Sequence, residues 1–380
     1  MNSLYIIIFV LASIVLLFIL FGIYYLACHK LRNKHRTIFR YHNKKIVAKQ
    51  SWSNVKFSDD NSAMFATDSK ASWGIVIGKF VGFGSFGIVH KAQKTTFDQK
   101  CDTTVAVKTM CSLDNSKQQS GEILNEIQTL RGLKHHLNVI TILHACRSNP
   151  MKDRQVSLVL EYCNYGDLKQ YLVLNKEAFF HNEQNPLIDH RRLLLTWTYD
   201  IAKGMQHLFR QNTLHGDLSL QNVLIQGYTI DGKIHLTAKL SDFGMSTTFP
   251  NAASYQQHRR TEGPWAWMAN EASDVWCFGV TIWEMLSFGQ NPYPVADSRP
   301  ESLMLDRKLP LLCPREVKEL LEMKYAPFYD LISRMCFVDD PMKRSEFPEI
   351  VVMVEKELTS EELKTYVMIE KMDIDNVYTT

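Results

Sequence analysis

The chain has 380 residues, of which 46% are apolar and 22% are charged, close to the average of soluble globular proteins. This composition excludes a disordered chain, and the length accommodates one two-lobed catalytic domain with tails or two ordinary domains. The formal net charge of only +3 argues against a general nucleic-acid-binding protein. The eight cysteines form no C-x-x-C pair and no zinc-finger spacing, so we expect reduced thiols in the cytosol.

The N-terminal segment predicts a membrane anchor. Residues 4–28 carry no charged side chain, and at about 1.5 Å per residue a helix of this length would cross a hydrocarbon core. A cleaved signal peptide is the alternative, but its apolar region spans only about 7 to 15 residues and follows a basic patch. No basic side chain precedes this segment. An uncleaved transmembrane helix is therefore the favoured prediction, with residues 1–3 outside the cytoplasm.

Residues 29–74 are predicted to be a basic juxtamembrane linker. Lysine and arginine recur from Lys30 to Lys49, and the first acidic residue is Asp59. By the positive-inside rule this side of the span stays in the cytoplasm, which predicts a single-pass protein of the plasma membrane. Cys28, at the edge of the span, is a candidate for palmitoylation, with an unmodified cysteine as the alternative.

A glycine-rich motif follows where short β-branched and aromatic runs begin, at Ile75. It reads VGFGSFGIV, and its glycines are Gly82, Gly84 and Gly87. Glycine lets backbone amides approach phosphate oxygens, because no Cβ stands in the way. A dinucleotide-binding turn shares the motif but leads directly into a helix, whereas Val89 continues here as β-type sequence. The motif therefore predicts a hairpin over a nucleotide.

The next predicted strand, VAVKT, carries Lys108, whose buried ammonium group would need an anionic partner. Glu126, in the helical pattern EILNEIQTLRGL, supplies a carboxylate, although a solvated glutamate on a helix face is the alternative. Paired in this way, the lysine would bridge the α and β phosphates of ATP.

The segment LVLEYCNYGDL, residues 158–168, is typical of a strand that runs into a short linker between two lobes. The backbone from Glu161 to Cys163 would present hydrogen-bonding groups to adenine. Leu160 would control the pocket behind the adenine.

Two further motifs follow a helical segment at 196–209. HGDLSLQNVL places Asp217 and Asn222 at the spacing where a carboxylate accepts a substrate hydroxyl proton and an asparagine holds a metal ion. SDFG then offers Asp242 as the main magnesium ligand. The chain contains the glycine loop, the lysine, the glutamate, H-x-D-x-x-x-x-N and DFG in this order. A chance match to all five motifs in order is negligible.

With these motifs, residues 75–358 resemble the catalytic domain of receptor protein tyrosine kinases. The resemblance continues through WMANEA, SDVWCFGVTIWEML and PMKRSEF. It implies an α+β, bilobal protein-kinase fold, with a β-rich N-lobe and a helical C-lobe, between the transmembrane helix and a C-terminal tail at 359–380. It also implies that Asp274 braces the catalytic loop and that Glu271 pairs with Arg344.

The resemblance implies ATP and Mg²⁺ as cofactors and tyrosine-bearing proteins as substrates. The catalytic residues it implies are Asp217, Lys108 and Asn222. The residues implied to bind the nucleotide are Gly82, Gly84, Gly87, Val89, Ala106, Lys108, Glu126, Glu161, Cys163 and Leu224. The metal ligands would be Asn222 and Asp242.

The catalytic loop also helps to predict which amino acid accepts the phosphoryl group. Ser219 stands where serine/threonine kinases have lysine, and neither Ser219 nor Gln221 is the arginine that tyrosine kinases carry. The Trp267-Met268 pair and the segments IAKGM and SDVWCFGV favour tyrosine. Tyrosine is therefore the predicted acceptor, with serine or threonine as the alternative.

Three departures from the family pattern bear on activity. Gly216 replaces the arginine of H-R-D, Gln221 replaces a cation near the transferred phosphate, and the interval from Glu271 to Asp274 lacks a short helix and loop. Two explanations for the short interval remain open. Either the part of the domain that supports the substrate is truly shorter, or the sequence lacks a piece because of a mis-joined exon. The leading prediction is a membrane-anchored signalling tyrosine kinase, and the alternative is a catalytically impaired pseudokinase that serves as a nucleotide-binding membrane scaffold.

Control is expected to come from the membrane or from a partner protein, because residues 1–3 leave almost no ectodomain. Tyr255 is the candidate phosphosite of the activation loop. Tyr366 and Tyr378, after the last predicted helix, are candidate phosphosites for phosphotyrosine-reading proteins, with ordinary tail tyrosines as the alternative.

Overall fold

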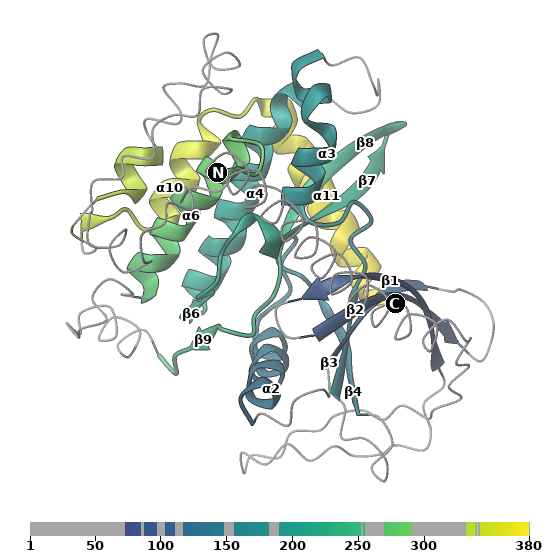
Figure 1. Cartoon of the computed structure of the whole chain (residues 1–380). Coiled ribbons are helices and arrows are strands. Elements are labelled where there is room, and N and C mark those ends of the chain that lie inside the picture. Colours follow the sequence, from purple (N-terminus) through teal and green to yellow (C-terminus); the bar gives the residue numbers. More distant parts are fainter. Residues whose placement is uncertain are drawn as a thin grey trace, which may run out of the picture. The chain divides into compact units, whose positions relative to one another are not determined.

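The computed structural model (Figure 1) describes part of the chain. The described residues are 73–84, 87–96, 103–110, 117–147, 156–181, 190–251, 254, 270–290, 332–338, 340 and 343–379. The predicted span at 4–28, the candidate phosphosite Tyr255 and the linker up to residue 72 lie outside them. Within the described ranges, no helix combines the length and the apolar character that a membrane crossing needs.

The N-lobe is an antiparallel sheet of five strands in the order β1-β2-β3-β5-β4. The strands are β1 (Trp73–Gly84), β2 (Gly87–Thr96), β3 (Thr103–Met110), β4 (Ile142–Arg147) and β5 (Val156–Glu161). Alternate residues of the strands point to one face, so Ile75, Ala92, Val105, Val107 and Val159 form a small core of their own. The lobe also contains helix α2 (Lys117–Gly132).

The glycine-rich motif forms the turn between β1 and β2. Gly84 lies opposite Gly87 at the end of the antiparallel ladder, and Val89 pairs with Gly82. A strand rather than a helix follows the glycines, so the predicted hairpin is confirmed and the dinucleotide-binding turn is excluded.

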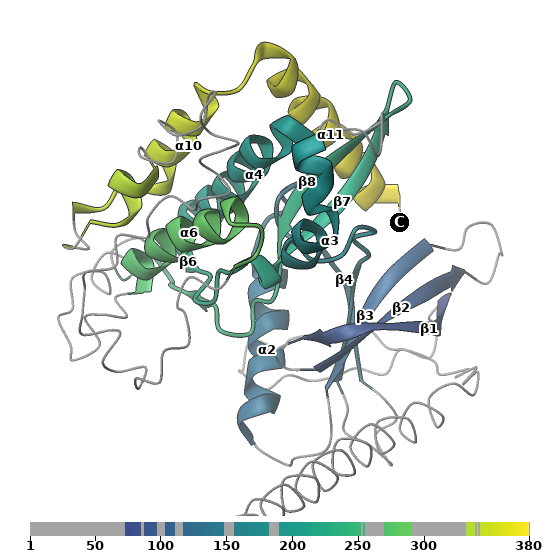
Figure 2. The same cartoon turned by 45° about the horizontal axis from the view of Figure 1, so that its top comes forward.

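The C-lobe is mainly helical. Its helices are α3 (Leu168–His181), α4 (His190–Arg210), α6 (Asn270–Leu286), α10 (Phe347–Glu355) and α11 (Ser360–Thr379). Its strands and one 3₁₀ helix are β6 (Thr213–Leu214), η1 (Leu220–Asn222), β7 (Val223–Ile230), β8 (Lys233–Leu240) and β9 (Thr247–Thr248). Figures 1 and 2 show α4 beside α6.

Trp197 on α4 lies at the centre of the large core. Its side chain is fully buried, and its Nε1 donates a hydrogen bond to the Leu236 backbone oxygen on β8 at 3.0 Å. This bond satisfies the indole N–H, which would otherwise be costly to bury. It ties α4 to the hairpin that carries the catalytic-loop and DFG segments at its two ends. The predicted bilobal fold is thus confirmed for the described residues.

Most of the predicted C-terminal tail, residues 359–380, forms helix α11, which the sequence patterns did not predict. Thr359 Oγ1 accepts the Glu362 N–H at 3.3 Å, and Glu362 Oε2 accepts the Thr359 N–H at 2.7 Å, which together form a capping box. Glu362 also binds Arg192 of α4 at 2.7 Å. In both views α11 runs along the β7–β8 hairpin (Figures 1 and 2).

Tyr366 is part of this packing rather than a free tail residue. Its hydroxyl donates to the Asn138 Oδ1 at 2.7 Å, and its ring meets the Tyr199 ring edge-on. Burial raises the pKa of Tyr366 well above its ordinary value. A kinase would reach this hydroxyl only after α11 had moved away. The side chain of Tyr378 lies outside the described residues.

Asp200 on α4 should make the stability of the fold depend on pH. Its buried carboxylate accepts the Ala238 N–H at 2.9 Å, but burial still raises its pKa to about 7. Because an unfolded aspartate has a pKa of about 3.9, the folded state holds the proton more tightly. This contribution to stability is complete below about pH 4 and is lost as the pH rises toward 7.

We therefore expect Asp200→Asn to lose less stability than the parent between pH 5 and pH 8. Urea unfolding at several pH values measures the slope. Asp231→Asn, at an exposed turn between β7 and β8, serves as the control. Equal slopes for the parent and Asp200→Asn would contradict the prediction.

Candidate active site

A buried lysine joins the two lobes. Lys108 on β3 places its Nζ 2.7 Å from Glu126 Oε2 on α2, so the ion pair predicted from the motifs is present. The same Nζ lies 3.0 Å from Asp242 Oδ1 in the DFG segment. Burial alone would lower the pKa of Lys108, but the two carboxylates outweigh it and raise the pKa above its ordinary value. The lysine therefore stays charged.

The DFG segment has a strained backbone at its aspartate. Asp242 has φ +64°, a left-handed conformation that costs a non-glycine residue about 1–3 kcal/mol. The next residue, Phe243, is fully buried, and its ring centroid lies 5.0 Å from that of His215. Packing of this phenylalanine holds the segment, so the carboxylate of Asp242 faces Lys108.

The catalytic loop brings Asp217 and Asn222 into contact. Asn222 Nδ2 donates to the Asp217 backbone oxygen at 2.7 Å and to its Oδ2 at 2.9 Å. Burial raises the pKa of Asp217, while the bond from Asn222 acts in the opposite direction. Ser241 connects this pair to the DFG segment, because its N–H donates to the Asn222 backbone oxygen at 2.8 Å.

Asp274 on α6 holds the start of the catalytic loop. Its Oδ2 accepts the His215 N–H at 2.8 Å, and its Oδ1 accepts the Gly216 N–H at 3.0 Å. The bracing contact that the resemblance implied is therefore present. Burial raises the pKa of Asp274 to about 6. The implied pair of Glu271 with Arg344 lies outside the described residues, because the Glu271 side chain is not among them.

The other residues implied to bind the nucleotide lie on adjoining strands and the linker. Val89 faces Lys108 across the β2–β3 ladder, and Ala106 faces Leu160 across β3–β5. Leu224, at the start of β7, bridges to Asp167 just after the linker. The positions of the glycine loop, the linker and β7 agree with a nucleotide site beside Lys108, and the individual roles remain predictions.

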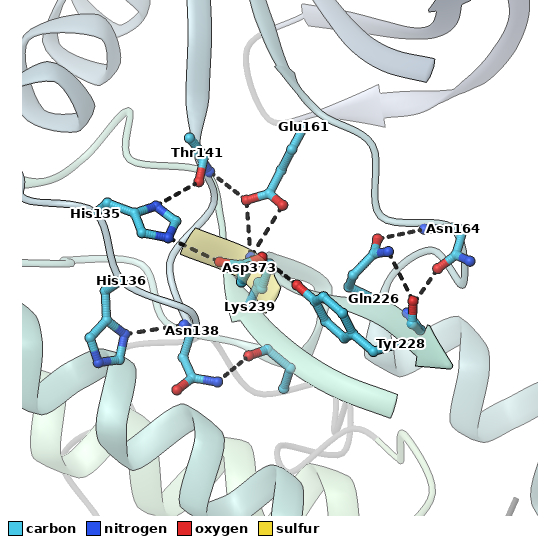
Figure 3. A network of polar contacts seen from close by, with 12 residues as sticks. His135, His136, Asn138, Thr141, Glu161, Asn164, Gln226, Tyr228, Lys239 and Asp373 are labelled. Atoms are coloured by element: carbon cyan, nitrogen blue, oxygen red, sulfur yellow. Dashed lines mark hydrogen bonds and ion pairs between the residues drawn. The ribbon is translucent and has the colours of Figure 1, made fainter. Parts of the chain in front are cut away.

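The Glu161 side chain lies in a polar environment that the motifs did not predict. Its Oε1 accepts the Thr141 N–H at 2.7 Å, and its carboxylate lies 3.2 Å from Nζ of Lys239, which is fully buried on β8. Lys239 also contacts Asp373 of α11 at 3.0 Å. Figure 3 shows how these side chains converge from the end of β5, from β8 and from α11. The Glu161 side chain therefore belongs to a buried polar network, while its backbone remains the part proposed to meet adenine.

Asp373 is the centre of that network. The Tyr228 hydroxyl donates to its Oδ1, and His135 Nε2 lies 3.0 Å from its Oδ2, although not aligned as a hydrogen bond. Burial alone would raise the pKa of Asp373, but the neighbouring His135, Lys239 and Tyr228 groups hold it at about 2. We define the buried network as Glu161, Lys239, Asp373, Tyr228 and His135.

Sequence reasoning missed two kinds of residue. Lys239 lies in an alternating strand as Lys108 does, so the rule that selected Lys108 would also have selected it. Asn125, next to Glu126, carried no such signal. Its Nδ2 lies 3.0 Å from the Gly244 oxygen and 2.7 Å from the Ser246 oxygen, both just after Asp242.

Gly216 departs from the family pattern for a reason visible in its backbone. Its φ is +77°, and a Cβ built there would lie 2.7 Å from the Met245 backbone oxygen. A side chain at this position would need both a strained conformation and a shift of the Met245 backbone. The glycine therefore fits this conformation of the loop, in which an arginine would not.

We expect Gly216→Ala to lower the free energy of unfolding by about 1–3 kcal/mol, because strain and steric contact add. Gly232→Ala is a matched control, because Gly232 has φ +76° and nothing within 4 Å of an added Cβ. Urea unfolding of both variants separates the cost of the conformation from that of the contact. Equal losses in the two variants would show that the Met245 backbone is not in the way.

A β-rich N-lobe, a helical C-lobe and a lysine that joins a helix glutamate to a DFG aspartate define the class of protein kinases. Residues 75–354 match the family model "Protein tyrosine and serine/threonine kinase". Because this match covers more than half of the chain, the chain belongs to that family.

The similar proteins include receptor tyrosine kinases. The tyrosine kinase receptor Cad96Ca of Drosophila melanogaster is 30% identical over 78% of this chain and 37% of its own length. The tyrosine-protein kinase Mer of Mus musculus is 30% identical over 74% of this chain and 27% of its length. Fibroblast growth factor receptor 1 of Xenopus laevis is 30% identical over 58% of this chain and 28% of its length. The matched region thus spans roughly a third of these relatives.

Proposed function

We propose that this chain is a membrane-anchored protein tyrosine kinase that transfers the γ-phosphoryl group of ATP to tyrosine in cytoplasmic proteins during signalling. The observation that carries the proposal is the position of Lys108 Nζ, 2.7 Å from Glu126 and 3.0 Å from Asp242. This contact joins β3 and the following helix α2 to the DFG segment, which lies 134 positions after Lys108. Relatives named as tyrosine kinases favour tyrosine over serine.

The proposed nucleotide site is built around that lysine. Lys108 binds the α and β phosphates, and the backbone of Gly82, Gly84 and Gly87 covers them. The aliphatic side chains that would enclose the adenine are Val89, Ala106 and Leu224. The backbone of the linker from Glu161 to Cys163 meets the edge of the base.

The catalytic loop supplies the residues for the chemical step. Asp217 accepts the proton of the tyrosine hydroxyl, and the bonds from Asn222 fix the orientation of its carboxylate. Asp274 holds the loop through two backbone amides, so the position of Asp217 depends on α6. The hydroxyl oxygen then attacks the γ-phosphorus while the ADP oxygen leaves.

Asp242 and Asn222 fit a magnesium site. The protein kinase family uses ATP and Mg²⁺ in general. A carboxylate and an amide oxygen are hard oxygen donors, and Mg²⁺ is commonly bound by one or two carboxylates together with phosphates. Ser241 joins the two residues, since its N–H and Oγ both donate to the Asn222 backbone oxygen, at 2.8 and 2.9 Å. A magnesium ion held there would offset the charge of the phosphates.

Transfer of labelled phosphate tests the proposal. The purified full chain, in detergent or nanodiscs, is given ATP, Mg²⁺ and a mixture of tyrosine and serine peptides. We expect phosphotyrosine as the product. Phosphoserine as the sole product would contradict the tyrosine assignment, and extraction of the full chain from membranes by alkaline carbonate would contradict the anchor.

The second candidate is a pseudokinase that binds nucleotide and serves as a membrane scaffold. It is supported by α6, which runs without interruption from Asn270 to Leu286 and so contains both Glu271 and Asp274. The continuous helix contains no additional helix and loop between these two residues that could support the substrate. A thermal shift with ATP but no phosphate transfer would favour this function. Transfer that Asp217→Asn removes would exclude it.

A further inference from the structure

The start of the activation segment contacts helix α2 through one amide side chain. Asn125 precedes Glu126 directly, and its Nδ2 lies 2.7 Å from the Ser246 backbone oxygen and 3.0 Å from the Gly244 oxygen. The Phe243 oxygen lies farther away, at 3.5 Å. An amide nitrogen carries two hydrogens, so the two shorter contacts account for both.

The C-lobe holds the same segment from its other side. Ser246 Oγ donates to the His215 backbone oxygen at 2.9 Å, and β9, which follows at Thr247, pairs with β6. Ser246 is buried. The backbone between Phe243 and Thr247 is therefore bonded to the catalytic loop on one side and to Asn125 on the other.

Asn125 and Glu126 are neighbours on helix α2, so the hydrogen bonds of Asn125 and the ion pair of Glu126 depend on the same helix position. Glu126 binds Lys108, and Asn125 binds the segment directly after Asp242. A rotation or displacement of α2 that separated Glu126 from Lys108 would also remove the Asn125 nitrogen from both carbonyl oxygens. Asp242 itself has a strained φ of +64°, so its place depends on contacts made by its neighbours.

We propose that Asn125 is a positioning residue for the phosphoryl transfer. It holds the Gly244 and Ser246 backbone against α2, and thereby keeps Asp242 facing Lys108. This inference rests on the proposed function for its kinetic consequence. Its structural part, the ordering of residues 243–248 by the Asn125 amide, stands without that function.

The test compares Asn125→Asp and Asn125→Ala with the parent full chain. The aspartate keeps the size of the side chain but places oxygen where the amide donated, opposite two carbonyl oxygens. Gln128→Ala is the control, because Gln128 is exposed on the same helix. Two measurements are made: amide hydrogen exchange across 240–250 without nucleotide, and kcat and KM for ATP.

We expect exchange at 243–248 to become at least tenfold faster in both Asn125 variants, with α4 unchanged. We expect kcat to fall by about tenfold or more, with a smaller change in KM and a larger effect for aspartate than for alanine. Exchange and kcat equal to those of Gln128→Ala would overturn the proposal. Faster exchange throughout the C-lobe would also overturn it, because the role would then be general stability.

The two proposals fail in different ways. A parent chain without transfer activity would contradict the proposed function and leave the exchange experiment to decide the role of Asn125. Normal transfer in Asn125→Asp would contradict the positioning role and leave the kinase function intact.

Discussion

Asp217→Asn should reduce kcat for phosphoryl transfer by about 10²- to 10⁴-fold, the contribution expected from a positioned general base. The replacement has nearly the same shape, and its side-chain oxygen can still accept the bond from Asn222 Nδ2, which lies 2.9 Å from Oδ2 in the parent. The loop should therefore keep its conformation. ATP affinity, measured with a fluorescent nucleotide, should stay within a few-fold of the parent.

Asp231→Asn is the matched control, because it makes the same chemical change at an exposed turn. It should retain full activity. Transfer by Asp217→Asn at the parent rate would show that Asp217 is not the base, or that the measured activity comes from another protein. A loss of nucleotide binding together with transfer would point to a general structural role instead.

Lys239→Met should produce the largest loss of stability. The lysine is fully buried between the carboxylates of Glu161 and Asp373, at 3.2 and 3.0 Å. Methionine fills much of the same volume but leaves the buried Asp373 carboxylate and the partly exposed Glu161 carboxylate without this cation. Removing one partner of a buried ion pair costs about 3–5 kcal/mol. Urea unfolding of the kinase domain in the full chain measures the difference.

Lys233→Met, on the same strand but exposed, should change stability by no more than about 0.5 kcal/mol. A double variant, Lys239→Met with Asp373→Leu, should recover part of the loss, because it removes charges of both signs. Simple addition of the two single losses would contradict a direct interaction between Lys239 and Asp373.

The sequence motifs predicted the contact of Lys108 with Glu126, because each motif fixes a short stretch of backbone. Lys108 and Glu126 could be paired because a buried ammonium group in a strand demands a carboxylate, and the helix after the strand offered one. The contact of Asp274 with the catalytic loop followed from the resemblance alone. These groups share a property: their roles depend on residue type and spacing.

The residues that escaped prediction depend on partners far away in the chain. Lys239 and Asp373 are separated by 134 positions, and no local pattern joins them. Asn125 contacts backbone oxygens, which every residue possesses, so residue type gave no signal. Helix α11, unlike these residues, had a local signal in the sequence, the capping box Thr359-x-x-Glu362. The helix was missed because its polar composition resembles a tail.

The sequence separation between Lys239 and Asp373 bears on how the protein folds during synthesis. Chains emerge from the ribosome N-terminal end first, and domains generally fold as units once enough of the chain is available. Lys239 is made 134 positions before Asp373, so while translation continues its ammonium group can contact Glu161 but not yet Asp373. Closure of the β7–β8 region by α11 must therefore wait until Asp373 has left the ribosome.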